Sequence, residues 1–366
     1  MYPFLFHYRY GVFKALEGYD DLEVTFVSDI EGRNGIESIP VELLHKHHQV
    51  KTRMLSRFTW QSGLVSRLIS SDYDAAIFHG DMWSLSTWVG ALVARTRRKR
   101  IYFWTIGWHR PDGAVLRRVR VAFYRLAHEL LIYGNIGKRL GAEMGFCPSR
   151  MTVIYNSHES SQTRSSEVSA VKLRIPRDGR PTVGAVIRLT AVKRLDLLLE
   201  AAVVLRMRGL DLRIVLAGDG PERQALEDMA TANALSVLFP GAIYAQEDLE
   251  EVYGALDLMV VPAAAGLTVI QSLNHGVPVV TDDDEYGQMP ESEAVIEGLT
   301  GGRYAKGDVR ALADAIQAWL KRVSLTPEET ARHSQNEVSA RWTPEAQAER
   351  IHSRLRFPGT AHASAK

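Results

Sequence analysis

Apolar and polar residues follow two different periods along this chain, and the two periods alternate. Short apolar runs are typical of buried strands, and most are separated by stretches with the spacing of helices, such as 84–98 and 135–145. A run at 3–8 predicts an opening strand that leads into a helix at Gly11. The other runs of the first half lie at 22–29, 75–80, 100–106, 129–134 and 151–157. This alternation predicts a parallel sheet covered by helices.

A second series of the same kind follows a serine-rich segment at 157–170, which lacks apolar periodicity and is predicted to be a linker or exposed connection. Its strands are predicted at 182–188, 212–218, 237–243, 257–262 and 277–282. Its helices are predicted at 192–208, 221–233, 247–255 and 267–275, and three more follow at 308–323, 327–342 and 344–355. The sequence therefore predicts an α/β protein with two Rossmann-like, doubly wound parallel-sheet domains.

The predicted organisation divides the chain into four parts. Its parts are an N-terminal domain at 1–157, a linker at 158–180, a C-terminal domain at 181–341, and a last helix and tail at 342–366. Two such domains are expected to face a cleft, with a ligand at the carboxyl ends of the strands.

Composition narrows the class of protein. A chain of 366 residues is long for one core, and 46% hydrophobic with 24% charged residues is an ordinary soluble balance. The net charge of +1 implies no general attraction to nucleic acid. The single cysteine, Cys147, excludes an internal disulfide and fits a reducing compartment. No apolar run approaches the roughly 20 residues of a membrane span, and the aromatic start lacks the pattern of a signal peptide. These features predict a cytoplasmic protein.

Basic residues are concentrated between 95 and 125, where the one acid is Asp112. They are Arg95, Arg97, Arg98, Lys99, Arg100, Arg110, Arg117, Arg118, Arg120 and Arg125. Part of this stretch reads as an amphipathic helix at 114–131. Such a helix can rest on an anionic membrane surface, or it can pack on the core with a solvated basic face. The sequence leaves both interpretations open.

Three stretches of the second domain offer groups for an anion. Arg188 and Lys193 follow a predicted strand, where a forked cation and a point charge suit a diphosphate. Gly218 and Gly220 permit a tight turn before a helix, which is either part of the site or simply a strand-to-helix turn. The run 266–268 opens a helix whose amides would face a phosphate, with the Thr268 hydroxyl as a further donor.

Other nucleotide-binding motifs are absent, and two clusters of polar residues give little evidence of a site. There is no Walker-type Gly-Lys-Ser/Thr, and no G-x-G-x-x-G follows the first strand, which disfavours ATPase and nicotinamide chemistry. The acidic run at 281–286 is interpreted as a solvated turn, and the histidines at 45–48 as a loop or edge strand. Neither has the spacing of a metal site.

Taken together, these residues resemble the family 4 glycosyltransferases of the two-domain GT-B fold. The matching stretches are Arg188 with Lys193, "GDGPER" at 218–223, "PGAIYAQEDLEEVYGALDLMVVP" at 240–262, "GLTVIQSLNHGVPVV" at 266–280 and "MPESEAVIEGLTGGRY" at 289–304. The resemblance is specific in the second domain and looser in the first.

The resemblance implies glycosyl transfer, with retention at the anomeric carbon, from a nucleoside-diphosphate sugar to a saccharide or lipid-linked acceptor. In the family the diphosphate is neutralised by the residues at Arg188 and Lys193 and by the amides of Gly266, Leu267 and Thr268. Gly218 and Gly220 would also lie near the donor, because the second domain would bind the nucleotide sugar. The first domain would lie on the acceptor side. Neither a metal nor another cofactor is implied. The activity would be hexosyltransferase-like and would serve polysaccharide or glycolipid assembly. Residues 95–125 would attach the protein peripherally to an anionic membrane. The last helix would cross back to the first domain.

The chain departs from the family pattern where carboxylates are usual. Two glutamates of the family correspond to Ala263 and Gln271. Gln271 retains polar atoms for ribose hydroxyls, whereas Ala263 has none for the sugar. The first domain often supplies a histidine near the sugar, and His109 is the nearest candidate.

Arg9 and Gly11, at the first strand–helix junction, are expected to meet phosphate or acceptor. Two alternatives remain beside a transferase. One is a nucleotide-sugar epimerase of the same fold, and the other is a non-catalytic nucleotide-binding subunit.

Overall fold

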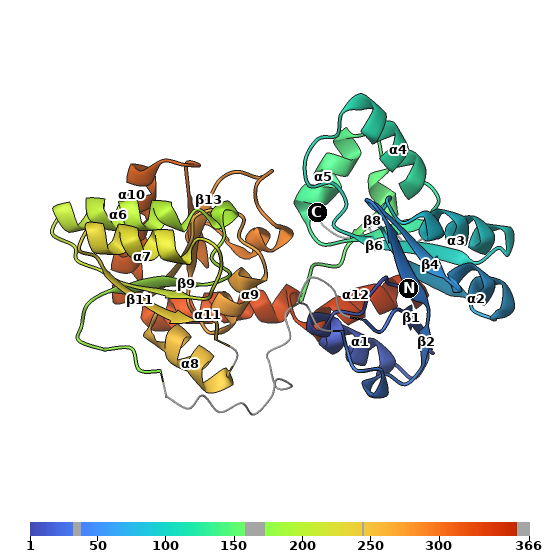
Figure 1. Cartoon of the computed structure of the whole chain (residues 1–366), viewed down its shortest axis with the longest axis horizontal. Coiled ribbons are helices and arrows are strands. Elements are labelled where there is room, and N and C mark those ends of the chain that lie inside the picture. The colour runs from blue at the N-terminus through green and yellow to red at the C-terminus, as the bar shows by residue number, and fades with distance from the viewer. Residues whose placement is uncertain (32–37, 158–172, 244, 357–366) are drawn as a thin grey trace. The chain divides into compact units, whose positions relative to one another are not determined.

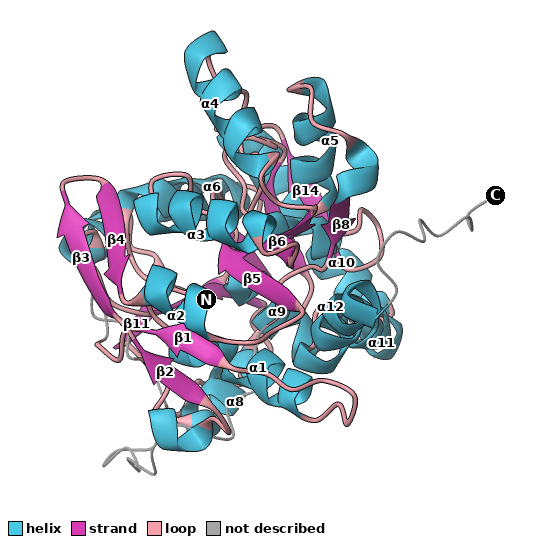
Figure 2. Ribbon diagram, turned by 90° about the vertical axis from the view of Figure 1, so that its right-hand side faces the viewer, coloured by secondary structure: helices cyan, strands magenta, loops and turns pink. Residues whose placement is uncertain are grey.

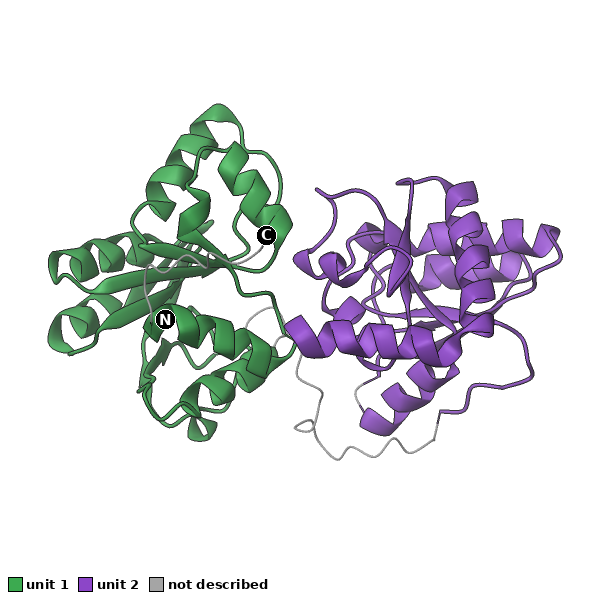
Figure 3. Cartoon of the chain, turned by 180° about the vertical axis from the view of Figure 1, so that it is seen from behind, with its two compact units in different colours: residues 1–159, 343–366 green, residues 160–342 purple. Residues whose placement is uncertain are grey.

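The computed structural model describes residues 1–31, 38–157, 173–243 and 245–356. The chain divides into two compact units, coloured separately in Figure 3. Unit 1 comprises residues 1–159 and 343–366, and unit 2 comprises residues 160–342. The predicted linker lies largely outside the described residues.

Unit 2 is built on a parallel sheet of six strands in the order β11-β10-β9-β12-β13-β14. The strands are β9 (Thr182–Val186), β10 (Arg213–Ala217), β11 (Ser236–Gly241), β12 (Leu258–Val261), β13 (Val279–Asp282) and β14 (Gly301–Tyr304). β10, β12 and β13 are buried along their whole length. Burial on both faces explains why they read as continuous apolar runs, and the first five strands confirm the predicted series.

Helices cover both faces of this sheet (Figure 1). α6 (Leu195–Met207), α7 (Arg223–Ala232) and α10 (Val309–Leu325) lie on one face, and α8 (Gln246–Ala255), α9 (Leu267–Asn274) and α11 (Pro327–Arg341) lie on the other. Leu198 and Leu205 of α6 and Ile316 of α10 are fully buried in the core against the sheet. Each helix therefore turns its apolar stripe to the strands, which leaves the strand ends free to build a site.

Unit 1 holds a four-stranded parallel sheet in the order β5-β6-β7-β8. Its strands are β5 (Ala75–His79), β6 (Arg100–Thr105), β7 (Glu129–Ile132) and β8 (Met151–Val153). β1 (Phe26–Ser28) pairs in parallel with β2 (His47–Gln49), and β3 (Lys51–Leu55) pairs antiparallel with β4 (Phe58–Ser62) as a hairpin (Figure 2). The helices are α1 (Tyr10–Glu17), α2 (Leu64–Ser70), α3 (Leu85–Thr96), α4 (Ala114–Tyr124), α5 (Asn135–Glu143) and α12 (Pro344–Arg356).

The last helix belongs to unit 1, although its sequence follows unit 2. Ala348 and Ile351 of α12 are buried in the same core cluster as Phe13 of α1. Arg354 forms an ion pair of 2.9 Å with the buried Glu129 at the start of β7. The helix is therefore held by both apolar packing and a charged contact.

The prediction of an opening strand at 3–8 is wrong. Only isolated bridges form there, from Phe4 to Asp29 and from Phe6 to Ser38. The segment still lies between β1 and β5, because Tyr2 N–H donates to the Val27 carbonyl and His79 N–H donates to the Met1 carbonyl. Pro3 has no N–H to offer, so a continuous ladder does not form.

The helix predicted at 114–131 is shorter than expected, and its apolar face differs. α4 ends at Tyr124, and Glu129 already belongs to β7. Val121, Phe123 and Tyr124 are its buried residues, whereas Val115 is 75% exposed and Val119 is 42% exposed. The amphipathic pattern therefore marks an outward apolar strip as well as an inward one.

Candidate functional site

The candidate site of unit 2 lies where the strand order reverses. β9 is flanked by β10 on one side and by β12 on the other. The strand that follows β10 lies at one edge of the sheet, and those that follow β12 continue toward the opposite edge. Such a switch point leaves a crevice at the carboxyl ends of the two central strands, which is where doubly wound sheets bind ligands. Arg188 and Lys193 follow β9, and the turn at 262–266 follows β12.

Two hydrogen bonds join the segments that leave β9 and β12. Lys193 Nζ donates to the carbonyl of Ala264 over 2.5 Å, and Thr268 Oγ1 donates to the carbonyl of Val186 over 2.6 Å. The structure therefore brings Lys193 beside the turn that opens α9. The Thr268 hydroxyl uses its proton on the main chain, so the amide of this residue remains the group that could serve a phosphate.

The turn itself has an unusual backbone. Ala264 has φ = 50°, in the left-handed region that a residue with a Cβ rarely adopts. Gln288, which is 2% exposed, accepts from the Ala265 amide over 2.7 Å and donates to Thr281 Oγ1 over 2.8 Å. The side chain of Gln288 thus ties the turn to β13, and neither this residue nor the conformation of Ala264 was predicted.

Lys193 lies in an environment that weakens its charge. Burial lowers the pKa of its ammonium group, while the carboxylate of Glu291 acts in the opposite direction. Glu291 is 3% exposed and comes from the short 3-10 helix Pro290–Ala294, which follows Gln288. A diphosphate beside Lys193 would supply the further negative charge that favours the protonated form. Glu291 was missed because no pattern in the sequence connects this segment with Lys193.

The two glycines of the second stretch have a steric role. Gly218 and Gly220 have φ values of +151° and +158°. A Cβ on Gly218 would lie 1.9 Å from the Ile187 carbonyl oxygen, and one on Gly220 would lie 2.2 Å from the Leu189 carbonyl oxygen. The turn therefore packs directly on the segment that carries Arg188, which is exposed and has no hydrogen-bond or ion-pair partner within the described residues.

The amino end of α9 is open to an anion. Gly266 precedes the helix with φ = −118° and ψ = −144°, and no side chain of the described residues caps it. The first amides of a helix have no partner within the helix, and here they include those of Leu267 and Thr268. Gln271 lies one turn further on, is half-buried, and makes no side-chain hydrogen bond within the described residues. Gly266, Leu267, Thr268 and Gln271 remain predictions as ligand contacts.

The residues predicted in the first domain have a different setting. Arg9 is only 8% exposed, and its guanidinium donates to the Tyr133 hydroxyl. Gly11 is half-buried in the first turn of α1. His109 is half-buried in the loop after β6. Their roles also remain predictions, and the burial of Arg9 was not expected.

The basic stretch at 95–125 is partly used inside unit 1. Arg95 donates to the Arg125 carbonyl over 2.9 Å, and Arg120 forms an ion pair of 2.5 Å with Asp112. Lys99 forms an ion pair of 3.0 Å with Asp72. Arg117 and Arg118 of α4 stay exposed. The charge that remains for an external surface is therefore smaller than the sequence suggested.

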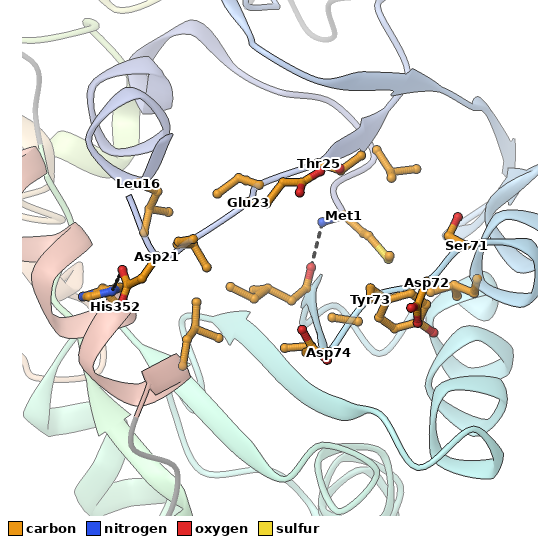
Figure 4. A pocket seen from close by; sticks show the side chains of 18 of the residues that line it. Met1, Leu16, Asp21, Glu23, Thr25, Ser71, Asp72, Tyr73, Asp74 and His352 are labelled. Carbon is orange, nitrogen blue, oxygen red and sulfur yellow. Dashed lines mark hydrogen bonds and ion pairs between the residues drawn. The ribbon is translucent and has the colours of Figure 1, made fainter. Parts of the chain in front are cut away.

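Unit 1 also contains a cavity of about 550 Å³ away from the strand ends where ligands are expected (Figure 4). Its lining includes residues 21–25, which precede β1, and residues 71–77, which lead into β5. It lies at the amino ends of these strands, where Met1 N donates to the Ile77 carbonyl over 2.7 Å. Its position at the amino ends of the strands distinguishes it from the carboxyl-end position at which parallel sheets bind ligands.

The acidic run at 281–286 begins inside β13, and Asp282 is 3% exposed, so the prediction of a solvated turn is wrong for this residue. Asp284 forms an ion pair of 2.5 Å with Lys306, and Asp282 accepts from Gln288 over 2.5 Å. In the part of the chain that the structure describes, no group of three or more histidine, cysteine, aspartate or glutamate side chains could hold a metal ion. Over the same residues, no helix is long and apolar enough to cross a membrane.

Solved structures share this architecture over nearly the whole chain. The glycosyltransferase from Rickettsia africae is 12% identical with a TM-score of 0.71, and the alignment covers 96% of this chain and 95% of that one. HepE of Anabaena, solved with UDP and glucose, is 17% identical with a TM-score of 0.65, and the alignment covers 96% of both chains. The fold is GT-B, as predicted.

Sequence comparison finds a family match in the second unit. Residues 172–337 match the family model of the glycosyl transferases group 1, so this part of the chain is similar to that family. The chain is 30% identical over 193 residues to D-inositol 3-phosphate glycosyltransferase of Mycobacterium sp. (strain JLS), covering 49% of this chain and 41% of the relative. It is 29% identical over 148 residues to alpha-D-kanosaminyltransferase of Streptomyces kanamyceticus, covering 39% and 37%. The matched stretch spans about two fifths of these curated relatives.

Proposed function

We propose that this protein is a retaining glycosyltransferase that moves a sugar from a nucleoside-diphosphate sugar to a saccharide or lipid-linked acceptor. The observation that carries the proposal is the joining of Lys193 to the turn before α9 through the Ala264 carbonyl. This contact sets a cation and the amino end of a helix around one point at the switch of the sheet. A diphosphate is the ligand that such a pair suits best.

The same groups would serve the chemistry as well as binding. When the bond from the anomeric carbon to the diphosphate breaks, negative charge grows on the departing phosphate oxygen. A fixed ammonium, the exposed Arg188 guanidinium and the first amides of α9 would stabilise that charge, which is an electrostatic form of catalysis. The transferase names of the relatives and the UDP and glucose bound to HepE support a nucleotide-sugar donor.

Turnover of a donor panel tests the proposal. UDP-, GDP- and dTDP-sugars are incubated with the protein, and release of the nucleoside diphosphate is followed with and without saccharide acceptors. We expect release with at least one donor. We also expect it to persist in excess EDTA, because side chains and amides stabilise the leaving group. Loss of activity in EDTA that manganese or magnesium restores would overturn the metal-independent part of the proposal.

A non-catalytic nucleotide-binding subunit is the second candidate. It is favoured by Ala263, which is half-buried in the turn and offers no carboxylate to a sugar. Nucleotide binding without release of any sugar above the Lys193→Ala background, across the whole panel, would make it the better reading. Interconversion of one nucleotide sugar into another would instead identify an epimerase.

Gln271 is expected to contribute to binding more than to chemistry. Its half-buried amide is placed one helical turn beyond the amides of α9 and would accept from or donate to the ribose hydroxyls. Gln271→Ala should weaken nucleoside-diphosphate binding by about 0.5–1.5 kcal/mol, the contribution of one neutral hydrogen bond. Calorimetric titration checks this, with Gln224→Ala on the exposed side of α7 as the control.

Gln271→Glu should bind almost as the parent does, because a carboxylate also accepts from hydroxyl groups. An unchanged affinity in Gln271→Ala would remove this residue from the site. A loss of turnover much larger than the loss of binding would give it a role in the chemical step instead.

Contact with an anionic membrane through α4 is part of the proposal for a lipid-linked acceptor. Val115 and Val119 are exposed on this helix beside the exposed Arg117 and Arg118. Each basic residue near such a surface contributes roughly 1 kcal/mol before screening. Co-sedimentation with vesicles should therefore rise with anionic lipid, fall with salt, and decrease in the double variant Arg117→Glu, Arg118→Glu.

The control for that measurement is Arg53→Glu, an exposed arginine of β3. Binding to neutral vesicles at the same level, or no binding to either kind, would count against membrane contact. A soluble saccharide acceptor would then be the better choice.

A further inference from the structure

Unit 1 contains a group of buried polar atoms that find no partner in the part of the chain that the structure describes. Tyr2 Oη, Arg9 Nη1, His79 Nδ1 and Trp104 Nε1 are each buried without a hydrogen-bond partner within the described residues. The four residues are close neighbours. The Arg9 guanidinium carbon lies 5.2 Å from the ring centres of both Tyr2 and Trp104, and the Tyr2 and His79 rings are 5.2 Å apart. Buried polar atoms are normally paired, so such a concentration calls for a missing partner.

The missing partner has a definite charge. Arg9 is 8% exposed, and within the described residues it has no carboxylate; its contacts are the aromatic rings and the hydroxyl of Tyr133. Arg213, the comparable buried arginine of unit 2, forms an ion pair of 2.8 Å with Asp178. Burial, with Arg9 nearby, lowers the pKa of His79 to about 3, so that imidazole is neutral at pH 7. The group therefore carries a positive charge that no carboxylate among the described residues pairs with.

The cluster lies where the sheet of unit 1 would bind a ligand. His79 is the last residue of β5 and pairs with Trp104 of β6, and Tyr133 follows β7 directly. These are the carboxyl ends of neighbouring parallel strands. Tyr8 is the member of the aromatic cage that is only half-buried, and its ring lies 5.6 Å from the Arg9 guanidinium. Tyr8 is therefore the ring of this cage that is partly open to solvent.

We infer that Arg9, with Tyr2 and Trp104 as neutral donors, recognises an oxyanion, a phosphate or carboxylate group, on the acceptor. The identification of the ligand as an acceptor rests on the proposed function. The binding of an anion by this group does not depend on glycosyl transfer. Displacement of Tyr8 would open the cage, and the anion would then accept from Arg9 Nη1 and from the donors that are now unpaired. The ligand would thus satisfy the charge and the hydrogen-bonding groups together.

The test is a titration that does not depend on turnover. The intact protein is titrated with glycerol 3-phosphate, with glucuronate and with glycerol, and tryptophan emission is recorded because Trp104 is part of the cage. A water-soluble short-chain phosphatidate is the lipid-borne form of the same anion. We expect a saturable change with at least one anion and none with glycerol, and the arm that responds identifies phosphate, carboxylate or lipid headgroup.

Variants assign the change to the cage. The variants are titrated by calorimetry, because Trp104→Phe removes the emitting ring. Arg9→Gln should weaken anion binding by about tenfold or more, and Trp104→Phe, which keeps the cation but removes one donor, by about threefold. Arg98→Gln, an exposed arginine of unit 1, is the matched control and should bind as the parent does. Thermal unfolding and nucleotide binding by unit 2 report whether each variant is folded.

The outcomes separate this inference from the proposed function. No saturable change with any anion, or equal anion affinity in the parent and Arg9→Gln, would overturn the inference while transfer by the parent could still be observed. If Arg9→Gln does not fold, the Trp104→Phe titration decides, since an affinity equal to that of the parent also overturns it. If the parent releases no more sugar than Lys193→Ala but still binds the anion, the proposed transferase activity is overturned. The inference of an oxyanion site is then still supported.

Discussion

Lys193→Ala is expected to slow release of sugar from the donor by about 10²- to 10³-fold, the effect of removing one preorganised group that stabilises charge in a transition state. The ammonium is partly buried and held 2.5 Å from the Ala264 carbonyl, so alanine would leave the departing phosphate without its nearest fixed cation. Binding of the nucleoside diphosphate should weaken less, by about 1.5–3 kcal/mol, because a charged hydrogen bond is lost in the ground state too.

Single-turnover rates and calorimetry measure these two losses separately. Lys321→Ala, an exposed lysine of α10, is the matched control and should leave both unchanged. Arg188→Ala should weaken diphosphate binding by a similar amount, since its guanidinium is exposed beside the same strand end. Unchanged nucleotide affinity in both Lys193→Ala and Arg188→Ala would falsify the diphosphate site.

The strands of unit 2 could be anticipated because the central ones are apolar on both faces. β12 has the sequence Leu-Met-Val-Val and is buried throughout. A run without polar side chains on either face is typical of a strand covered on both faces. Once such strands are recognised, the residues after them must meet at one edge of the sheet. This is why Lys193 and the turn at 262–266 were predicted to lie together although 71 residues separate Lys193 from Ala264.

Strands with an exposed face carry no such signal. β3 is mostly exposed and reads Lys-Thr-Arg-Met-Leu, and its hairpin with β4 was not predicted. β14 begins with two glycines, and a Cβ on Gly301 would lie 1.9 Å from the Val279 carbonyl oxygen. That requirement comes from the neighbouring strand, so it is invisible in the local pattern.

The supporting residues of the site were hidden for a related reason. Gln288 acts on the turn through a hydrogen bond to the Ala265 amide, across a loop with no periodicity. The Thr268 hydroxyl was predicted for a phosphate, but the Val186 carbonyl at the end of β9 takes its proton. Local sequence indicates which groups are available. Whether such a group is already hydrogen-bonded inside the protein depends on carbonyls that other strands bring close to it.

Gly218→Ala is expected to destabilise unit 2 by about 2–6 kcal/mol, the sum of backbone strain and forced displacement of packed atoms. The added Cβ would lie 1.9 Å from the Ile187 carbonyl oxygen, and a main-chain atom has no rotamer by which to move aside. Relief would require the segment after β9 to shift, which would carry Arg188 away from the strand end. Nucleotide affinity should therefore fall together with stability.

Gly209→Ala separates strain from collision. Gly209 also has a positive φ of +84°, but a Cβ there would meet nothing within 4 Å, so only the left-handed backbone is disfavoured. That variant should lose about 1–2 kcal/mol and bind nucleotide as the parent does. Urea unfolding gives the two losses, and titration with the nucleoside diphosphate gives the two affinities. Equal destabilisation by Gly209→Ala and Gly218→Ala would mean that the contact with Ile187 costs nothing. The close packing of the Gly218 turn would then no longer explain how Arg188 is positioned.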